Sequence, residues 1–207
     1  MKKIMFNDKY GLTQAVLEGR KTMTRRIIKT PRTMEGKDVY GFSVVKYPRT
    51  GVPIEVMALD ADEAQINNIL PVYKPGEVVA VAQAYDDIVS TELYADELLV
   101  DKLHLEDTPG WSNKMFVCAD LMPHQIRITN VRVERLQDIS DEDCLLEGVE
   151  RIDNNDELIY KAFDIKKGFV YSTTPRGAFI ALIDRISGKG TWASNPWVFV
   201  YEFELVK

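Results

Sequence analysis

The chain has 207 residues, of which 45% are hydrophobic and 28% are charged, with 26 Lys and Arg against 32 Asp and Glu. This composition excludes a disordered tail, a collagen-like repeat and a membrane protein, and the length suits one domain or two. The two cysteines and two histidines are too few for a disulfide framework and show no zinc-ligand spacing. We therefore expect a reduced protein without a metal ion or a cofactor.

The amino terminus begins with lysines, but Asn7, Asp8 and Lys9 interrupt it before the apolar core of a signal peptide can form. No apolar run approaches the roughly 20 residues that span a membrane. The sequence therefore predicts a cytoplasmic protein with no membrane partner.

Charge is distributed unevenly along the chain. Residues 1–50 contain 12 Lys and Arg but only 4 Asp and Glu, whereas residues 51–110 contain 2 and 13. The net charge of −6 thus averages a basic first quarter with an acidic remainder. Either the opposite charges meet on the folded surface, or the basic segment faces an anionic ligand.

The first expected element is a helix over residues 8–18, with Asn7 as its cap and Gly19 at its end. A basic strand over residues 20–28 follows. Residues 31–75 are rich in Pro and Gly and predict either a long loop or an inserted hairpin. The turn KPGE at residues 74–77 then leads into a buried strand over residues 78–82.

The second half begins with an expected strand over residues 114–119. Two alternating runs follow, at 126–128 and 131–136, and they are out of phase by one residue. This offset predicts a β-bulge near Thr129-Asn130.

Ser140 begins a short predicted helix that Gly148 ends, and Cys144 on this helix is expected to be buried rather than reactive. A second helix is expected over about residues 175–186 and a closing strand over residues 197–205. This order predicts an α+β fold, with a small mixed barrel and flanking short helices.

The densest polar cluster is GRKTMTRR at residues 19–26, with four cations and two hydroxyls. Neighbouring cations lower the pKa of a lysine, and a neutral lysine can take the proton of a threonine nucleophile. In a regular strand Lys21 and Thr24 point to opposite faces, so this pairing needs Lys21 to lie in the turn after Gly19, or a strand that begins later. Residue types alone favour a solvated basic strand over a catalytic site.

Four motifs together resemble the ASCH-domain family, a branch of the PUA-like barrels. They are GRKTMTRR after a short helix, KPGE before an apolar strand, VRVERLQDIS running into DEDCLLEG, and the closing NPWVFVYEFEL. The resemblance covers about half the chain and is strongest for the longer phage and bacterial members. It implies a single PUA-like domain over residues 1–207, with insertions at about 31–73, 86–113 and 151–174. Because the family's folds host several functions, the resemblance does not specify an activity.

Some small bacterial members of this family are acetylcytidine amidohydrolases that use a lysine and a threonine of this motif with a glutamate. The resemblance implies that Lys21 is the general base, that Thr24 attacks the acetyl carbonyl, and that Glu147 orients Lys21 or the substrate. Arg26 would hold the pyrimidine or stabilise the developing oxyanion.

The leading expectation is that the protein binds RNA or a modified nucleoside in a basic cleft. Arg20, Arg25 and Arg26 would contact the ligand, and Trp192, beside a Gly-rich turn, would lie at the edge of the site. The first alternative is an amidohydrolase acting on acetylcytidine-like nucleosides, and the second is a phage-derived accessory module for protein contacts.

One departure from the family bears on the cleft. Longer members tend to carry an Arg-Glu-Thr-Trp-like stretch after the apolar strand, where this chain has Gln83-Ala84-Tyr85-Asp86. A cation and a carboxylate are thereby removed from the expected cleft wall. A continuous positive groove open at both ends would favour a polymer, whereas a closed pocket in which Lys21, Thr24 and Glu147 converge within hydrogen-bond reach would favour the hydrolase.

Overall fold

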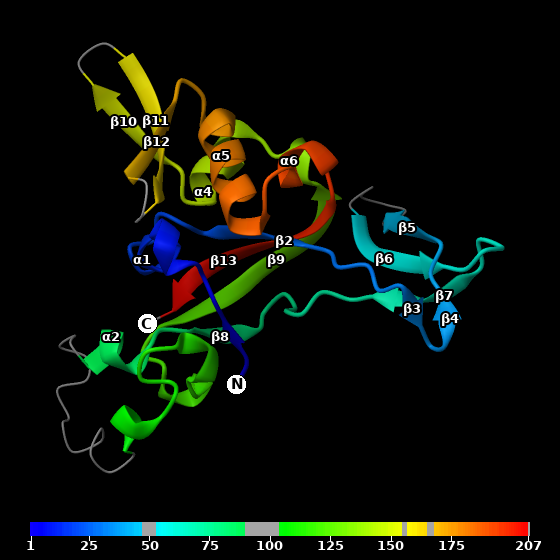
Figure 1. Ribbon diagram of the computed structural model, residues 1–207, viewed down its shortest axis with the longest axis horizontal. Helices are drawn as coiled ribbons and strands as arrows, with labels where there is room; N and C mark the ends of the chain where they lie inside the picture. The colour runs from blue at the N-terminus through cyan, green and yellow to red at the C-terminus, as the bar shows by residue number, and fades with distance from the viewer. Residues whose placement is uncertain (47–52, 90–103, 155–156, 165–167, 207) are drawn as a thin grey trace.

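The computed structural model describes residues 1–46, 53–89, 104–154, 157–164 and 168–206 (Figure 1). The protein has the expected α+β fold, with several sheets and short helices. None of the helices in these ranges is long and apolar enough to cross a membrane.

A mixed five-stranded sheet forms the centre of the molecule. Its order is β1-β8-β9-β13-β2, in which β1 runs parallel to β8 and the other neighbours are antiparallel. The long, curved strands β9 and β13 pair along their whole lengths (Figure 1). The strands are β1 (Lys3–Ile4), β2 (Met23–Ile27), β8 (Val78–Val81), β9 (Gln125–Arg135) and β13 (Trp197–Val206).

The predicted bulge is confirmed within β9. Glu202 of β13 pairs with Asn130 and Phe203 pairs with Ile128, so Thr129 is the extra residue. The extra residue shifts the strand by one position, so that the apolar side chains on both sides of the bulge face the core. Ile128 before it and Val133 after it are both buried.

The predicted first helix consists of two parts, η1 (Asp8–Tyr10) and α1 (Leu12–Leu17). Gly11 separates them because its φ of 64° is outside the helical range. Asn7 caps the start as expected, since its side chain accepts a hydrogen bond from the Lys9 amide.

The predicted strand over residues 20–28 begins later than expected, at Met23. After Gly19, whose φ is 71°, the Lys21 amide donates to the Ala15 carbonyl and the Thr22 amide donates to the Leu146 carbonyl. These bonds hold Lys21 in the turn that follows α1.

The segment over residues 31–73 contains inserted hairpins rather than one long loop. It lies at one end of the molecule (Figure 1), and buried Val56 and Ala58 lie on its strand β6, which packs against β9. Its elements are the hairpin β3 (Thr33–Met34) and β4 (Lys37–Asp38), and the sheet β5 (Gly41–Lys46), β6 (Pro53–Leu59) and β7 (Gln65–Ile69).

The expected strand over residues 114–119 is wrong. The Asn113 side chain accepts from the Met115 amide and begins a tight turn, so the segment forms two single-turn 3-10 helices. Most of the acidic segment 86–107 lies outside the described residues. The elements here are α2 (Tyr85–Val89), η3 (Leu105–Asp107), η4 (Lys114–Phe116) and η5 (Ala119–Leu121).

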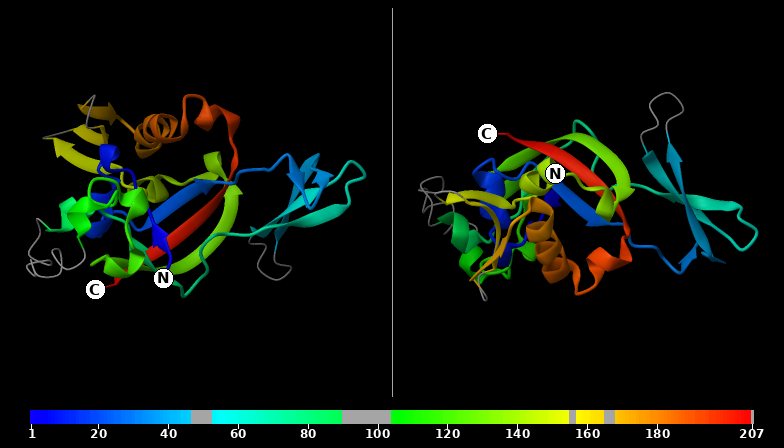
Figure 2. Two further views of the ribbon diagram at one scale, coloured as in Figure 1. Left: turned by 60° about the horizontal axis from the view of Figure 1, so that its bottom comes forward. Right: turned by 90° about the horizontal axis from the view of Figure 1, so that it is seen from above.

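A helical layer covers one face of the central sheet, and a further three-stranded sheet packs on α5 (Figures 1 and 2). Cys144, Phe179 and Val198 belong to the apolar cluster between this layer and the sheet. The elements are η6 (Leu136–Asp138), α4 (Asp141–Leu146), β10 (Glu150–Asn154), β11 (Glu157–Asp164), β12 (Gly168–Ser172), α5 (Pro175–Ser187) and α6 (Thr191–Ser194).

Candidate functional site

A cavity of about 780 Å³ lies beside β2 and β13. Its wall is formed by the segment after β1, the end of α4, one side of α5 and the segment after β7. Five of the predicted site residues line it, namely Lys21, Thr24, Arg25, Arg26 and Glu147.

The register of β2 against β13 fixes the floor of this cavity. Thr24 pairs with Tyr201, and Arg26 pairs with Phe199. Residues opposite one another in a ladder share a face, and alternate residues of one strand also share a face. Thr24 and Arg26 therefore face the cavity together, and all four residues line it.

Lys21 is almost fully buried, at 2% exposure. Its Nζ donates to Glu147 Oε2 at 2.6 Å, to the Glu147 carbonyl at 2.7 Å and to the Met23 carbonyl at 2.7 Å. An ammonium group has three N–H donors, so these contacts use all of them.

The pKa of Lys21 lies below its usual value. Burial is the main cause, because it penalises the charged form, and the Glu147 carboxylate opposes it. Arg26 and Arg25 lower the pKa further. The direction agrees with the effect expected from neighbouring cations, but the burial of Lys21 was not evident from the sequence.

Glu147 lies directly after the last residue of α4 and is 5% exposed. One carboxylate oxygen accepts from Lys21, and the other accepts from Arg25 Nη1 at 3.2 Å. The next residue, Gly148, has a φ of 104°, and a Cβ there would lie 3.1 Å from Leu12 Cδ2. A glycine thus allows α4 to end close against α1 and Lys21.

Thr24 is 5% exposed and lines the same cavity as Lys21. Among the residues that the structure describes, no hydrogen bond joins its hydroxyl to Lys21, whose donors go to Met23 and Glu147. The structure therefore brings Lys21, Thr24 and Glu147 to one cavity, with the Lys21 ammonium bonded to Glu147 and Met23.

Arg26 faces the cavity from the edge strand β2. Its Nη2 donates to the Met5 carbonyl at 2.6 Å, and its guanidinium lies 5.7 Å from the centre of the Phe6 ring. Within the described ranges it forms no ion pair with a carboxylate. Lys3 and Lys29 also line the cavity.

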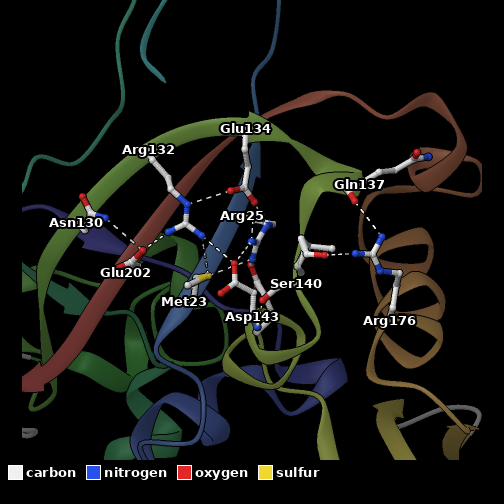
Figure 3. Close-up of polar contacts among 12 residues, drawn as sticks. Met23, Arg25, Asn130, Arg132, Glu134, Gln137, Ser140, Asp143, Arg176 and Glu202 are labelled. Carbon is white, nitrogen blue, oxygen red and sulfur yellow. Dashed lines mark hydrogen bonds and ion pairs between the residues drawn. The ribbon is translucent and has the colours of Figure 1, made fainter. Parts of the chain in front are cut away.

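Arg25 reaches a group of carboxylates from α4 and β9 (Figure 3). Its Nε donates to Glu134 at 2.8 Å and its Nη2 donates to Asp143 at 2.5 Å. Arg132 donates to the same two carboxylates and also pairs with Glu202. Sequence reasoning missed these partners, although the i, i+4 spacing of Asp143 and Glu147 was a usable signal.

Two predicted ligand-binding residues lie outside the cavity lining. Arg20 forms ion pairs with Glu18 at 2.5 Å and Glu150 at 3.1 Å. Trp192 packs edge-on against Phe179, with 6.4 Å between ring centres. Neither residue lines the cavity.

The stretch from Gln83 to Asp86 is also absent from the cavity lining. Gln83 is buried and contacts His124 Nδ1 at 2.8 Å, and Tyr85 belongs to the cluster around α2. Within the described part of the chain, no group of three or more His, Cys, Asp or Glu side chains is placed to hold a metal ion.

Comparisons with family models, curated proteins and solved structures found no significant match. The ASCH resemblance therefore rests on the sequence motifs.

Proposed function

We propose that this protein is an amidohydrolase that removes the acyl group of acetylcytidine-like nucleosides. The observation that carries the proposal is that Lys21, Thr24 and Glu147 line one cavity, although Lys21 and Glu147 are 126 residues apart in the chain. The proposal takes the ASCH resemblance, with its PUA-like barrel, as its starting point.

The size of the cavity favours a small ligand. At about 780 Å³ it falls within the roughly 300–1,000 Å³ typical of small-molecule sites. Three of the four cations of the GRKTMTRR motif, Arg20, Lys21 and Arg25, already form ion pairs with carboxylates of the protein. Arg26 is thus the motif cation best placed to meet a ligand.

In the proposed reaction Thr24 Oγ1 attacks the acyl carbonyl carbon, and Lys21 accepts the hydroxyl proton. The C–N bond then breaks, Lys21 returns the proton to the leaving amine, and the acyl group remains on Thr24 as an ester. Water hydrolyses this ester, which releases the carboxylic acid and restores the hydroxyl. Arg26 would stabilise the oxyanion of each tetrahedral intermediate.

The protonation state of Lys21 controls this scheme. Its three hydrogen bonds belong to the ammonium form, which cannot accept a proton from Thr24. Burial lowers the pKa of Lys21 and so favours the neutral amine that a general base requires. We therefore expect turnover to rise with pH until Lys21 is deprotonated.

The test is acetylcytidine hydrolysis by the wild-type protein and by Lys21→Ala, Thr24→Val and Arg20→Gln. Loss of a general base typically lowers kcat by about 10²–10⁴-fold, which we expect for Lys21→Ala. Thr24→Val keeps the side-chain shape without the nucleophile and should be inactive. Arg20→Gln is the matched control, because it removes a motif cation outside the cavity, and should keep wild-type kcat.

Two outcomes would overturn this assignment. A wild-type protein that does not hydrolyse acetylcytidine would remove the enzymatic function. Equal turnover by the wild type and Lys21→Ala would leave the activity but remove Lys21 as its base.

A second candidate is binding of RNA or a modified nucleoside without turnover. It is favoured by Lys3, Arg26 and Lys29, which line the cavity without a carboxylate partner among the described residues. RNA affinity in the same preparations should then fall as salt rises, because bound phosphates release counterions. Affinity that is absent at low salt, or independent of salt, would exclude the polymer.

A further inference from the structure

Every nitrogen of the Arg25 guanidinium already contacts an acceptor of the protein. Its Nε donates to Glu134, its Nη1 to Glu147 and the Met23 sulfur, and its Nη2 to Asp143, with Glu134 2.6 Å from the same nitrogen. Four of these contacts are hydrogen bonds and the fifth is an ion-pair contact, so all three nitrogens of the guanidinium are engaged by the protein. The side chain is 1% exposed, so Arg25 lines the cavity with its guanidinium turned to protein partners.

The carboxylate partners of Arg25 come from two elements other than its own strand. Asp143 and Glu147 are four residues apart and lie on the same side of α4, whereas Glu134 belongs to β9. Arg25 itself is on β2. The planar guanidinium therefore ties the end of α4 to the sheet and fixes Glu147 at its Oε1, while Lys21 binds Oε2.

We propose that Arg25 is a positioning residue, which holds the Glu147 carboxylate in the orientation in which it meets Lys21 and does not itself bind substrate. Its effect on Lys21 is independent of any substrate. Its effect on turnover rests on the proposed function.

The charges around Lys21 determine what the loss of Arg25 would do. Glu147 from α4 and Arg25 and Arg26 from β2 are the charged groups that act on Lys21, and the Phe6 ring lies 5.9 Å from Nζ. Removing Arg25 deletes a nearby cation that lowers the pKa of Lys21, and this change favours the ammonium form. The pKa of Lys21 should therefore rise.

Arg132 provides a matched control. It donates to Glu134 at 3.0 Å and to Asp143 at 2.8 Å, and it pairs with Glu202. Its ion pairs thus include two of Arg25's carboxylate partners but not Glu147. Arg25→Met and Arg132→Met each remove one guanidinium from the same cluster, and only the first removes a contact of Glu147.

The experiment is an NMR titration of the Lys21 side-chain nitrogen in the wild type, Arg25→Met and Arg132→Met. We expect a higher Lys21 pKa in Arg25→Met and an unchanged one in Arg132→Met. Where acetylcytidine is hydrolysed, the pH profile of kcat should move to higher pH in Arg25→Met, by about tenfold in kcat per pKa unit on the rising limb, with little change in KM.

An unchanged Lys21 pKa in Arg25→Met, or equal shifts in the two variants, would assign Arg25 a structural role only and overturn the proposal. Absence of turnover in the wild type would remove the proposed function and leave this titration valid. The two failures are therefore distinguishable.

Arg25→Lys keeps a positive charge beside the buried carboxylates. It is the variant to use if Arg25→Met does not fold. A lysine cannot reach all of the acceptors that the guanidinium holds, so Glu147 loses its second anchor. Proton exchange at the Lys21 ammonium should then accelerate, whereas Arg132→Lys should leave it at the wild-type rate. Unaltered exchange in Arg25→Lys would also overturn the proposal.

Discussion

At the scale of single residues, the site depends on the buried Lys21, whose Nζ lies 2.6 Å from Glu147 Oε2. The condition that Lys21 precede the strand followed from residue spacing, whereas the site role of Glu147 followed from the ASCH resemblance. The burial of Lys21 followed from neither, because it depends on Glu147, which is 126 residues away. From the sequence alone, a lysine beside three other cations is expected to be exposed to solvent. Its burial is predictable only when its distant carboxylate partners are known.

The lowered pKa of Lys21 predicts a pH-dependent stability. Between this pKa and the ordinary value of 10.5, the unfolded chain binds a proton that the folded chain has released, so the Lys21 contribution to the free energy of unfolding rises with pH. Tyr73 and Tyr201 act in the opposite sense above about pH 10, because burial raises their pKa values. Lys21→Met lacks only the lysine contribution.

Urea unfolding from pH 7 to 10.5 measures this effect as the wild-type free energy of unfolding minus that of Lys21→Met. We expect the difference to increase with pH. Lys29→Met, which removes an exposed lysine, controls for net charge. A difference that stays constant or decreases would contradict the lowered pKa.

At the scale of elements, sequence patterns predicted correctly those features that depend on neighbouring residues alone. Apolar and polar residues alternate on both sides of Thr129 but are out of phase by one residue, and this offset predicted the bulge. Ser140 predicted the start of α4. The strand expected over residues 114–119 was wrong, because the Asn113 side chain caps a turn there. Propensity alone does not reveal that competing hydrogen bond.

The cap of α4 matters because this short helix carries Asp143 and Glu147 into the site. Ser140 Oγ accepts from the Asp143 amide at 3.0 Å, and Ser140 is exposed. Ser140→Ala should lower the free energy of unfolding by about 1 kcal/mol, as loss of a helix cap does. Ser140→Asn keeps a capping oxygen and should lose much less. Equal stability of the Ala variant and the wild type in urea titrations would show that the cap contributes nothing.

At the scale of the whole molecule, internal pairing explains part of the uneven charge. Arg20, Lys21 and Arg25 from the basic quarter meet carboxylates that lie between residues 134 and 150, on β9, on or directly after α4, and on β10. Three of the four motif cations are therefore already paired with carboxylates, which weakens the alternative that this segment forms a basic surface for a polyanion. The segment 31–73 folds as two separate sheets, which its Pro and Gly content did not specify.

The two cysteines differ in burial, so their reactivity can be used to test the packing of the helical layer on the central sheet. Cys118 is exposed, whereas Cys144 is buried between the helical layer and the central sheet, as expected from the sequence, and burial raises its pKa to about 12. The thiolate is the reactive form, so Cys144 should react only when these layers separate.

A thiol reagent at pH 8 should therefore modify one cysteine rapidly in the native protein and both in urea. Cys118→Ser should abolish the rapid phase and leave a slow phase, whose rate increases as the layers are destabilised by urea. If Cys144 reacted rapidly in native Cys118→Ser, the helical layer would open without global unfolding. The buried contacts of Glu147 and Lys21 would then be open to solvent too, because Cys144 lies on α4 and Glu147 directly follows this helix.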